Sequence, residues 1–145
     1  MFKKIIVAVD GSAASDAAID LAASLCTLCG AHLTLCHVLQ VPRPAHDAGG
    51  FAREAMMDDE TRAGHAVLDA ARHRIELAGL SADQVLQTGA AADGLLAETE
   101  ERGCDAIVMG SRGRGALARA VLGSVASDVI SRSPVPVIVA PHPHG

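Results

Sequence analysis

The sequence contains almost no aromatic residues: two phenylalanines, no tyrosine and no tryptophan among 145 residues. The flat side chains on which nucleic-acid bases stack are therefore nearly missing, which excludes a base-stacking platform. The net charge of −5 at pH 7 also argues against nucleic acid or an anionic membrane surface as a partner.

Long hydrophobic runs are missing as well. No apolar stretch approaches the roughly 18 residues that a bilayer-spanning helix needs. The run behind the lysines at positions 3 and 4 covers only Ile5–Val9 before Asp10 interrupts it, which is too short for a signal peptide. We therefore expect a cytoplasmic protein with no membrane partner, whose four cysteines are reduced thiols.

The composition is that of a globular protein, since 50% of the residues are hydrophobic and 20% are charged. At roughly 150 residues per domain, a chain of this length predicts one domain. A chain of this size buries about 70% of the surface that it exposes when unfolded, so it can form a substantial core.

Short apolar runs alternate with segments of helical periodicity. Strands are expected at 5–9, 33–39, 84–88, 106–109 and 135–140, and helices between Ser12 and Gly30 and at 52–78, 93–102 and 124–131. Residues 40–50, with two prolines and two glycines, are expected to be a loop, in which His46 stays an open candidate for ligand contact. Pro136 cannot donate to a neighbouring strand, so the last strand is expected at a sheet edge.

This alternation predicts the fold class and the place of a ligand site. Continuous rather than alternating apolar strands indicate burial on both faces. We therefore expect an α/β fold: a single-domain, open, doubly wound parallel sheet of five strands, Rossmann-like, with helices on both faces. Ligands of such sheets bind at the carboxyl ends of the strands, where the strand order reverses. Asp10 and Gly110 follow the first and fourth strands, and they face one crevice if those strands are neighbours.

The glycine-rich segment after the fourth strand, residues 110–123, carries the most information. Glycines let the backbone approach a ligand closely, and successive N–H groups in such turns bind anions. Gly123 and Ser124 begin a helix, whose free N–H groups also favour a phosphate. A Gly-Lys-Ser/Thr phosphate loop is missing from the sequence, and the G-x-G-x-x-A match at 113–118 follows the wrong strand for a dinucleotide motif.

The spacing Gly110-x2-Gly113-x9-Gly123-Ser124 resembles the G-x2-G-x9-G-S/T motif of nucleotide-binding members of the universal stress protein family. Other similar segments follow in the same order over the whole chain: Val7–Ser12, His37-Val38, Gly89, Asp105–Gly110 and Pro134–Val139. The resemblance implies a universal stress protein domain over residues 1–141, followed by a flexible tail at 142–145.

The resemblance implies a site for ATP with Mg²⁺ or Mn²⁺, in which Asp10 lies near the ribose. The other implied residues are Ala8, Val9 and Val38 around the adenine, and Met109, Gly110, Arg112, Gly113, Gly123, Ser124 and Val125 around the phosphates. The metal is expected to arrive with the triphosphate rather than in a cage of protein ligands. One departure is Ala126, which stands where some binding members carry a second hydroxyl residue.

The glycine motif and the family resemblance leave three hypotheses for the function open. The leading one is an ATP-binding switch in the stress response, acting as a homodimer through strand 135–140 and on a protein partner that the sequence does not identify. The second is slow ATP hydrolysis, at most weak, because the sequence offers no evident general base and no lysine for the γ-phosphate. The third is a dimeric interaction module without a ligand.

Cys26-x2-Cys29-x2-His32 resembles a metal-ligand cluster, but a packing role is favoured. Cys29 is expected on the buried stripe of the first helix, where a thiol packs as a small apolar group. A redox pair needs the positive end of a helix, whereas these cysteines lie near the carboxyl end. Neither a metal site nor a redox site is therefore expected.

Overall fold

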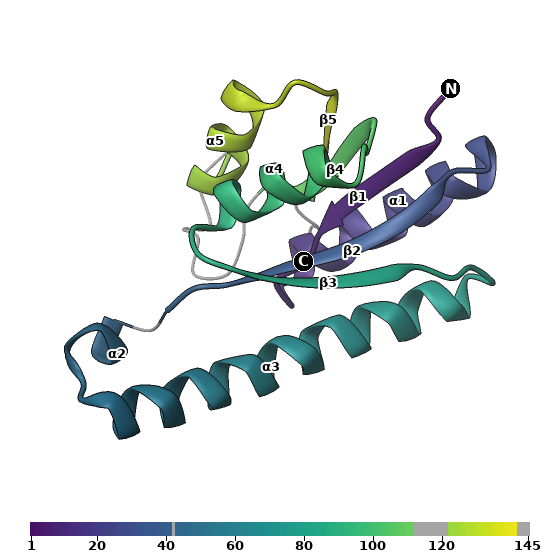
Figure 1. Ribbon diagram of the computed structural model, residues 1–145. Coiled ribbons are helices and arrows are strands. Elements are labelled where there is room, and N and C mark those ends of the chain that lie inside the picture. Colours follow the sequence, from purple (N-terminus) through teal and green to yellow (C-terminus); the bar gives the residue numbers. More distant parts are fainter. Residues whose placement is uncertain (42, 112–121, 142–145) are drawn as a thin grey trace.

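The computed structural model describes residues 1–41, 43–111 and 122–141. Its elements, in chain order, are β1 (Lys4–Ala8), α1 (Ala13–Cys29), β2 (His32–Leu39), α2 (Arg43–Asp47), α3 (Gly50–Leu77), β3 (Asp83–Thr88), α4 (Ala91–Glu101), β4 (Ala106–Gly110), α5 (Ser124–Arg132) and β5 (Val137–Ala140) (Figure 1). Arg112, Gly113 and the expected tail at 142–145 lie outside the described residues.

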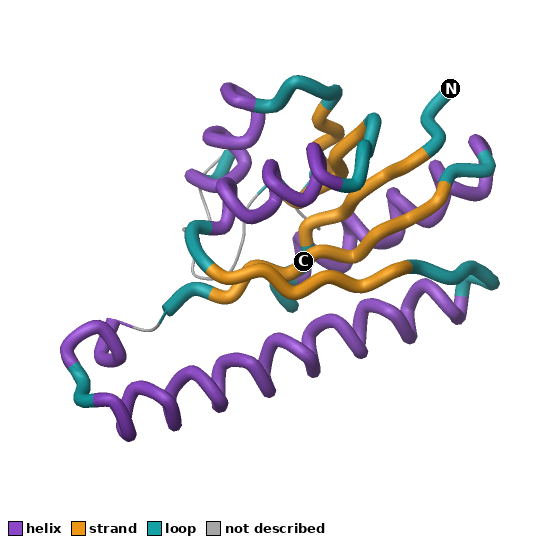
Figure 2. Tube along the Cα trace, viewed as in Figure 1, coloured by secondary structure: helices purple, strands orange, loops and turns teal. Residues whose placement is uncertain are grey.

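The five strands form one parallel sheet in the order β3-β2-β1-β4-β5. The chain winds from β1 through β2 to β3 and then returns to the other side of β1, so the strand order reverses between β1 and β4. Helices α1 and α3 cover one face of the sheet and α4 and α5 cover the other (Figures 1 and 2). This arrangement confirms the α/β, doubly wound fold predicted from the sequence.

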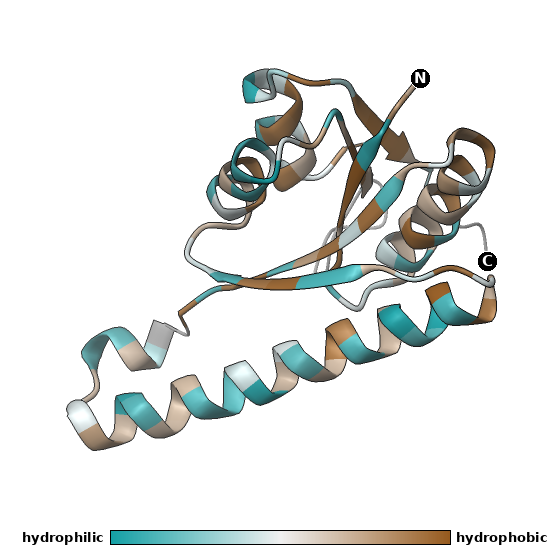
Figure 3. Cartoon of the chain, turned by 45° about the vertical axis from the view of Figure 1, so that its right-hand side comes forward, coloured by the Kyte–Doolittle hydropathy of each residue, from teal (hydrophilic) through white to brown (hydrophobic). Residues whose placement is uncertain are grey.

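The strand side chains alternate between two hydrophobic cores. Ile5 and Val7 point into the core that α1 and α3 complete, whereas Ile6 and Met109 point into the core that α4 and α5 complete. Figure 3 shows the hydrophobic colour concentrated on the central strands. In the described parts of the chain, no helix combines the length and the apolar character that crossing a membrane requires.

Helix α1 begins and ends where the sequence indicated. The Ser12 hydroxyl accepts a hydrogen bond from the Ser15 N–H at 3.1 Å, and Gly30 ends the helix at φ 69°. The expected burial of Cys29 was wrong, however. Alanines and Cys26 face the sheet, Cys29 is only half-buried, and Leu28 is 83% exposed. Small alanine side chains let the helix lie close to the strands, while Leu21 and Leu25 pack partly buried at the margin of the core.

The cysteines of the cores are held as neutral thiols. Burial raises the pKa of Cys26 to about 11 and that of Cys36 to about 12. Burial also raises the pKa of Cys104. These thiols therefore pack as small apolar groups at neutral pH.

The expectation of a loop over residues 40–50 was wrong in part. Residues Arg43–Asp47 form the short helix α2, because Pro44 falls in its first turn, where a missing N–H breaks no hydrogen bond. Helix α3 begins at Gly50, and its first half extends past the ends of the strands (Figure 1). Its buried residues start only at Gly64, and the exposed Ala78, the last residue of the predicted helix, is its C-cap.

The last strand is shorter than predicted, because β5 begins at Val137 rather than at residue 135. Pro136 precedes the strand, and its carbonyl accepts the Ile107 N–H at 3.0 Å. The expected edge position is confirmed, since β5 is the last strand in the sheet order and, among the described strands, pairs with β4 alone.

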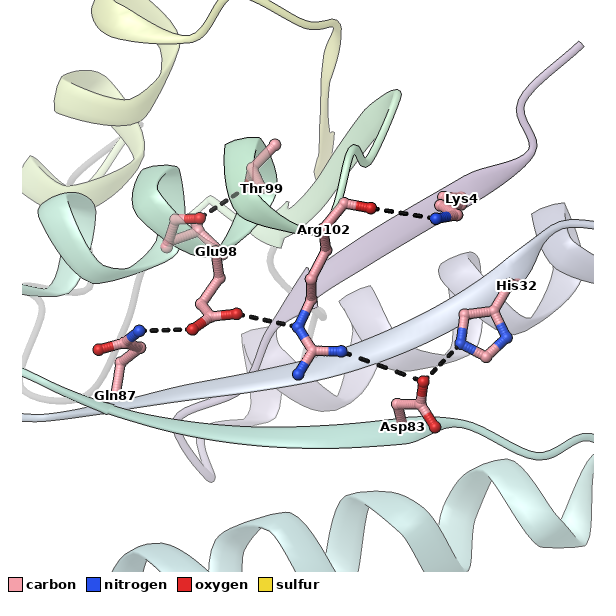
Figure 4. A network of polar contacts seen from close by, with 8 residues as sticks. Lys4, His32, Asp83, Gln87, Glu98, Thr99 and Arg102 are labelled. Atoms are coloured by element: carbon pink, nitrogen blue, oxygen red, sulfur yellow. Dashed lines mark hydrogen bonds and ion pairs between the residues drawn. The ribbon is translucent and has the colours of Figure 1, made fainter.

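A polar network connects α4 with three strands (Figure 4). Glu98, only 6% exposed, accepts hydrogen bonds from Gln87 of β3 and, at 2.9 Å, from Nε of Arg102. This hydrogen bond raises the pKa of Arg102. The Arg102 guanidinium also lies 4.0 Å from Asp83, and Asp83 contacts His32 at 2.8 Å. The backbone carbonyl of Arg102 accepts a hydrogen bond from Lys4 Nζ. The charge of the buried Glu98 carboxylate is thus balanced by the Arg102 guanidinium.

Asp105 joins the start of β4 to the start of β1. Its carboxylate accepts the Lys3 N–H at 2.8 Å and the Lys4 N–H at 3.2 Å. The hydrogen bond from the Lys3 N–H holds the pKa of Asp105 below its usual value. Because the folded pKa lies below the unfolded one, this carboxylate stabilises the fold above about pH 4, and the contribution is lost as the pH falls through the folded pKa.

We expect Asp105→Asn to lower the free energy of unfolding by about 1 kcal/mol at pH 7, since an amide accepts these N–H groups less strongly than a carboxylate. Urea unfolding at pH 7 and at pH 3 measures the effect, and the difference from wild type should shrink at the lower pH. Asp59→Asn, at an aspartate whose side chain is 75% exposed, is the control. A gap between Asp105→Asn and wild type that widens toward pH 3 would contradict the assignment.

Candidate functional site

The carboxyl end of the sheet brings the predicted segments together. β1 and β4 are neighbours, with Val7 opposite Val108. The segments that follow these strands, which begin with Val9 and Ser111, therefore leave the sheet side by side. This is the condition under which the sequence predicted one crevice for both motifs.

The turn after β1 is tightly hydrogen-bonded. The Asp10 N–H donates to Ser15 Oγ at 3.1 Å, and Asp10 Oδ1 accepts the Ser12 N–H at 2.9 Å. Gly11 has φ +82°, a left-handed conformation that a side chain would strain. These bonds hold the half-buried Asp10 in a defined orientation at the tip of β1.

The end of β4 lies directly against the first turn of α1. A Cβ atom on Gly110 would lie 2.8 Å from both Cβ and the carbonyl oxygen of Ala14, closer than real Cβ atoms approach. Glycine is therefore needed here for space. The sequence reading assigned Gly110 to phosphate binding alone, and the packing against α1 is a second reason for this residue.

The two ends of the glycine motif meet beside β4. The Ser111 N–H donates to the Ala140 carbonyl of β5 at 3.1 Å, and the Gly123 N–H donates to the Ser111 carbonyl at 2.6 Å. These bonds bring the N-terminus of α5 back to the strand that precedes the motif. Gly110 and Ser124, although 14 positions apart in the sequence, thus belong to one end of the molecule.

An open cavity of about 530 Å³ lies at this end of the molecule. Two of its lining residues, Ser124 and Val125, were predicted as site residues. The others come from the segment after β2, from α2, from the start of α4 and from α5: Gln40, Val41, His46, Gly89, Ala90, Ala91, Ala92 and Asp128. The remaining predicted residues that the structure describes are not among the lining residues: Gly123 is the N-cap of α5, and the others occupy the strand tips, namely Ala8, Val9, Asp10, Val38, Met109 and Gly110.

Two helix N-termini open onto the cavity. The N-cap residues of α4 and α5 are Ala90 and Gly123, and neither makes a side-chain capping hydrogen bond. The N-cap side chains therefore supply no acceptor to the backbone N–H groups of the first turns, and the helix dipoles make the N-termini favourable for an anion. Ser124 adds an exposed hydroxyl at the start of α5.

The negative charge in the cavity wall is balanced from outside. Asp128 pairs with Arg132 at 3.1 Å, and Arg132 also contacts Asp93 of α4 at 2.8 Å. This guanidinium ties the last turn of α5 to the first turn of α4. Within residues 1–41, 43–111 and 122–141, no group of three or more histidine, cysteine or acidic side chains could hold a metal ion.

The sequence reading missed the contribution of α4. Gly89, which follows β3 and has φ +130°, was the available signal, because it marks a sharp turn at the same end of the sheet. His46 was left open and lies in the cavity wall. Gln40 and Asp128 carry no pattern that distinguishes them from exposed polar residues elsewhere in the chain.

Comparison with known proteins gives a consistent result. The model of the universal stress protein family matches residues 1–141. Universal stress protein YxiE of Bacillus subtilis is 31% identical over 146 residues, which cover 96% of this chain and 99% of that protein. Hypothetical protein MJ0577 has a solved structure similar to this one, with a TM-score of 0.87 at 26% identity, covering 100% of this chain and 99% of the other. The universal stress protein from Archaeoglobus fulgidus, solved in complex with dAMP, has a TM-score of 0.72 at 25% identity, covering 94% and 96%.

Proposed function

Because this chain belongs to the universal stress protein family, we propose that it binds an adenine nucleotide, ATP with Mg²⁺ or Mn²⁺, at the carboxyl ends of β1 and β4. The observation that carries this proposal is the pair of hydrogen bonds that joins Ser111 to β5 and to Gly123. They place both ends of the glycine motif, and the N-terminus of α5, beside the tip of β4.

The residues proposed to bind the phosphates are the best defined part of the site. The uncapped first turn of α5 offers N–H groups and the Ser124 hydroxyl to anionic oxygens. Arg112 and Gly113 complete the motif in the sequence. Asp10, at the neighbouring strand tip, is assigned to the ribose, because a carboxylate accepts hydrogen bonds from the ribose hydroxyl groups.

The cavity suits the rest of the nucleotide. Its volume of about 530 Å³ falls within the range of about 300–1,000 Å³ that small-molecule sites occupy. Ala8, Val9 and Val38 stay the residues assigned to the base, and Val41 and the alanines of α4 add apolar lining to the cavity. The A. fulgidus relative that was solved with dAMP supports an adenine derivative as the ligand.

The metal is assigned to the nucleotide rather than to the protein. Among the lining residues that the structure describes, Asp128 and His46 are titratable, and Asp128 already pairs with Arg132. A donor set of this kind fits a cation that keeps most of its ligands from phosphate and water, as Mg²⁺ does. Bound to ATP, the cation supplies neutralising charge for the phosphate chain.

Thermal unfolding with and without ATP and Mg²⁺ tests the proposal. At a ligand concentration about 100 times Kd, binding adds about 2.7 kcal/mol of stability, which corresponds to a rise in Tm of about 8 °C. Gly123→Val should abolish this rise, because a branched side chain would obstruct the phosphate loop. An unchanged Tm of the wild-type protein at millimolar ATP and Mg²⁺ would refute nucleotide binding.

The chain offers a matched control for Gly123→Val. Gly49 is the N-cap of α3 with φ −67° and ψ 165°, and Gly123 is the N-cap of α5 with φ −73° and ψ 165°. Gly49→Val therefore makes the same substitution in the same backbone conformation, away from the glycine motif. It should leave the ATP-induced rise in Tm unchanged.

We further propose a homodimer through β5, so that nucleotide binding at the start of α5 changes the surface presented to a protein partner. The edge strand supports this, because Val137, Ile138 and Val139 are only partly buried and β4 is the one neighbour of β5 in the part of the chain that the structure describes. Light scattering should give twice the chain mass of 14.8 kDa. A mass of one chain at micromolar concentration would favour a monomeric binding protein.

A further inference from the structure

His37, on β2, connects the tip of β1 to helix α3. Its Nδ1 atom lies 2.6 Å from the Val9 carbonyl oxygen. The opposite side of the ring lies close to α3, where a Cβ atom on Gly64 would be 3.1 Å from His37 Cδ2 and 3.0 Å from side-chain carbons of Leu39 and Leu86. The ring therefore has little room to rotate away from the carbonyl.

The contact fixes the hydrogen on the ring. A carbonyl oxygen only accepts hydrogen bonds, so Nδ1 must be the donor. In the neutral imidazole this places the proton on Nδ1 and leaves the lone pair on Nε2. The structure thus assigns one tautomer to His37.

The same contact holds one peptide group from both sides. The Val9 carbonyl and the Asp10 N–H belong to a single planar unit. His37 donates to its oxygen, and Ser15 Oγ accepts from its nitrogen at 3.1 Å. With both ends bound, the plane cannot rotate, and the direction in which Asp10 leaves the strand is fixed.

We propose that His37 is a positioning residue of the nucleotide site: by holding the Val9–Asp10 peptide plane, it sets the orientation of Asp10 toward the ribose. This inference rests on the proposed function for its effect on binding. The tautomer and the rigidity of the turn follow from the contact itself, and they can be measured without a nucleotide.

Two substitutions separate positioning from packing. In His37→Asn the side-chain amide nitrogen takes the place of Nδ1 and still donates to the Val9 carbonyl. In His37→Leu the bulk beside Gly64 is kept but the donor is lost. We expect His37→Leu to weaken ATP binding about tenfold, as loss of one partly buried hydrogen bond does, and His37→Asn to stay within about twofold of wild type.

His32→Leu is the matched control, since His32 lies at the opposite end of the same strand and also makes a hydrogen bond, to Asp83. It should bind ATP as wild type does. Exchange of the Asp10 amide hydrogen should be about tenfold faster in His37→Leu than in wild type or His37→Asn.

Nitrogen NMR of the ligand-free protein tests the inference apart from nucleotide binding. A proton on Nδ1 of His37 supports it, whereas a proton on Nε2 with a bare Nδ1 overturns it. If wild type binds ATP, equal affinity of His37→Leu overturns it too. If wild type binds no adenine nucleotide, the proposed function fails, and the tautomer and the Asp10 exchange rate still decide whether His37 holds the turn.

Discussion

Gly110→Ala is expected to lower the free energy of unfolding by about 3 kcal/mol, near the upper end for overpacking a core. The added methyl group would meet Ala14 at 2.8 Å, and two of the three nearest atoms belong to the Ala14 backbone. No flexible side chain can move aside, so the start of α1 must shift as a unit. Chemical denaturation gives the change, and Tm should fall by about 10 °C.

The same shift should reach the proposed nucleotide site. Ala14 lies in the first turn of α1, beside the hydrogen bonds that hold Asp10 and Ser12. We therefore expect Gly110→Ala to lose ATP binding even at temperatures where the variant remains folded.

Gly50→Ala is the control for this substitution. Gly50 begins α3, and a Cβ atom there would meet nothing within 4 Å. In a helix, alanine is more favourable than glycine by roughly 0.5–1 kcal/mol, so this variant should be unchanged or slightly more stable. Equal stabilities of Gly110→Ala and Gly50→Ala would contradict the packing described for β4.

Arg102→Met is expected to cost about 2–3 kcal/mol, because it strands the Glu98 carboxylate in the core. Glu98 has a side chain only 8% exposed and accepts the Nε hydrogen bond of Arg102, whose side chain is 33% exposed. Because Arg102 itself reaches solvent, the expected loss lies at or below the lower end of the range for buried pairs.

A double substitution distinguishes a stranded charge from lost packing. Glu98→Met with Arg102→Met removes both charges, and it should be more stable than Arg102→Met alone. Arg62→Met is the exposed control, since Arg62 and Asp59 are 76% and 75% exposed, and it should change stability by less than about 0.5 kcal/mol. A double variant less stable than Arg102→Met would contradict the account.

The sequence predicted the elements whose signals are local. The buried run from Ile5, the Ser12 cap and the Gly30 stop depend on neighbouring residues only, and the structure agrees with them to within about one residue at these ends. The burial of Cys29 was predicted wrongly, because helical spacing alone does not say how close each residue of α1 comes to the sheet. Which residues of α1 are buried depends on the distance of the helix from the sheet. That distance is set by contacts with residues far along the chain, such as Gly110.

The candidate site, too, was predictable only where its residues form a pattern within one segment of the sequence. The glycine motif was recognisable because its spacing is contiguous in the sequence. The contribution of α4 was not, since Ala91 and Ala92 reach the cavity only through the packing of β3 beside β2 and of α4 against α5. The double role of Gly110, in space as well as in the motif, needed the coordinates of Ala14.

The position of β1 at the centre of the sheet has a consequence for synthesis on the ribosome. Its first neighbour, β2, follows it closely, but its second neighbour, β4, comes about one hundred residues later, as the Lys4–Asp105 separation of 101 shows. At translation rates of about 5–20 residues per second, one side of β1 stays without a neighbouring strand for roughly 5–20 s. The nascent chain therefore exposes the edge of Ile5–Val7 throughout that interval, and this is the stage at which a chaperone has most to protect.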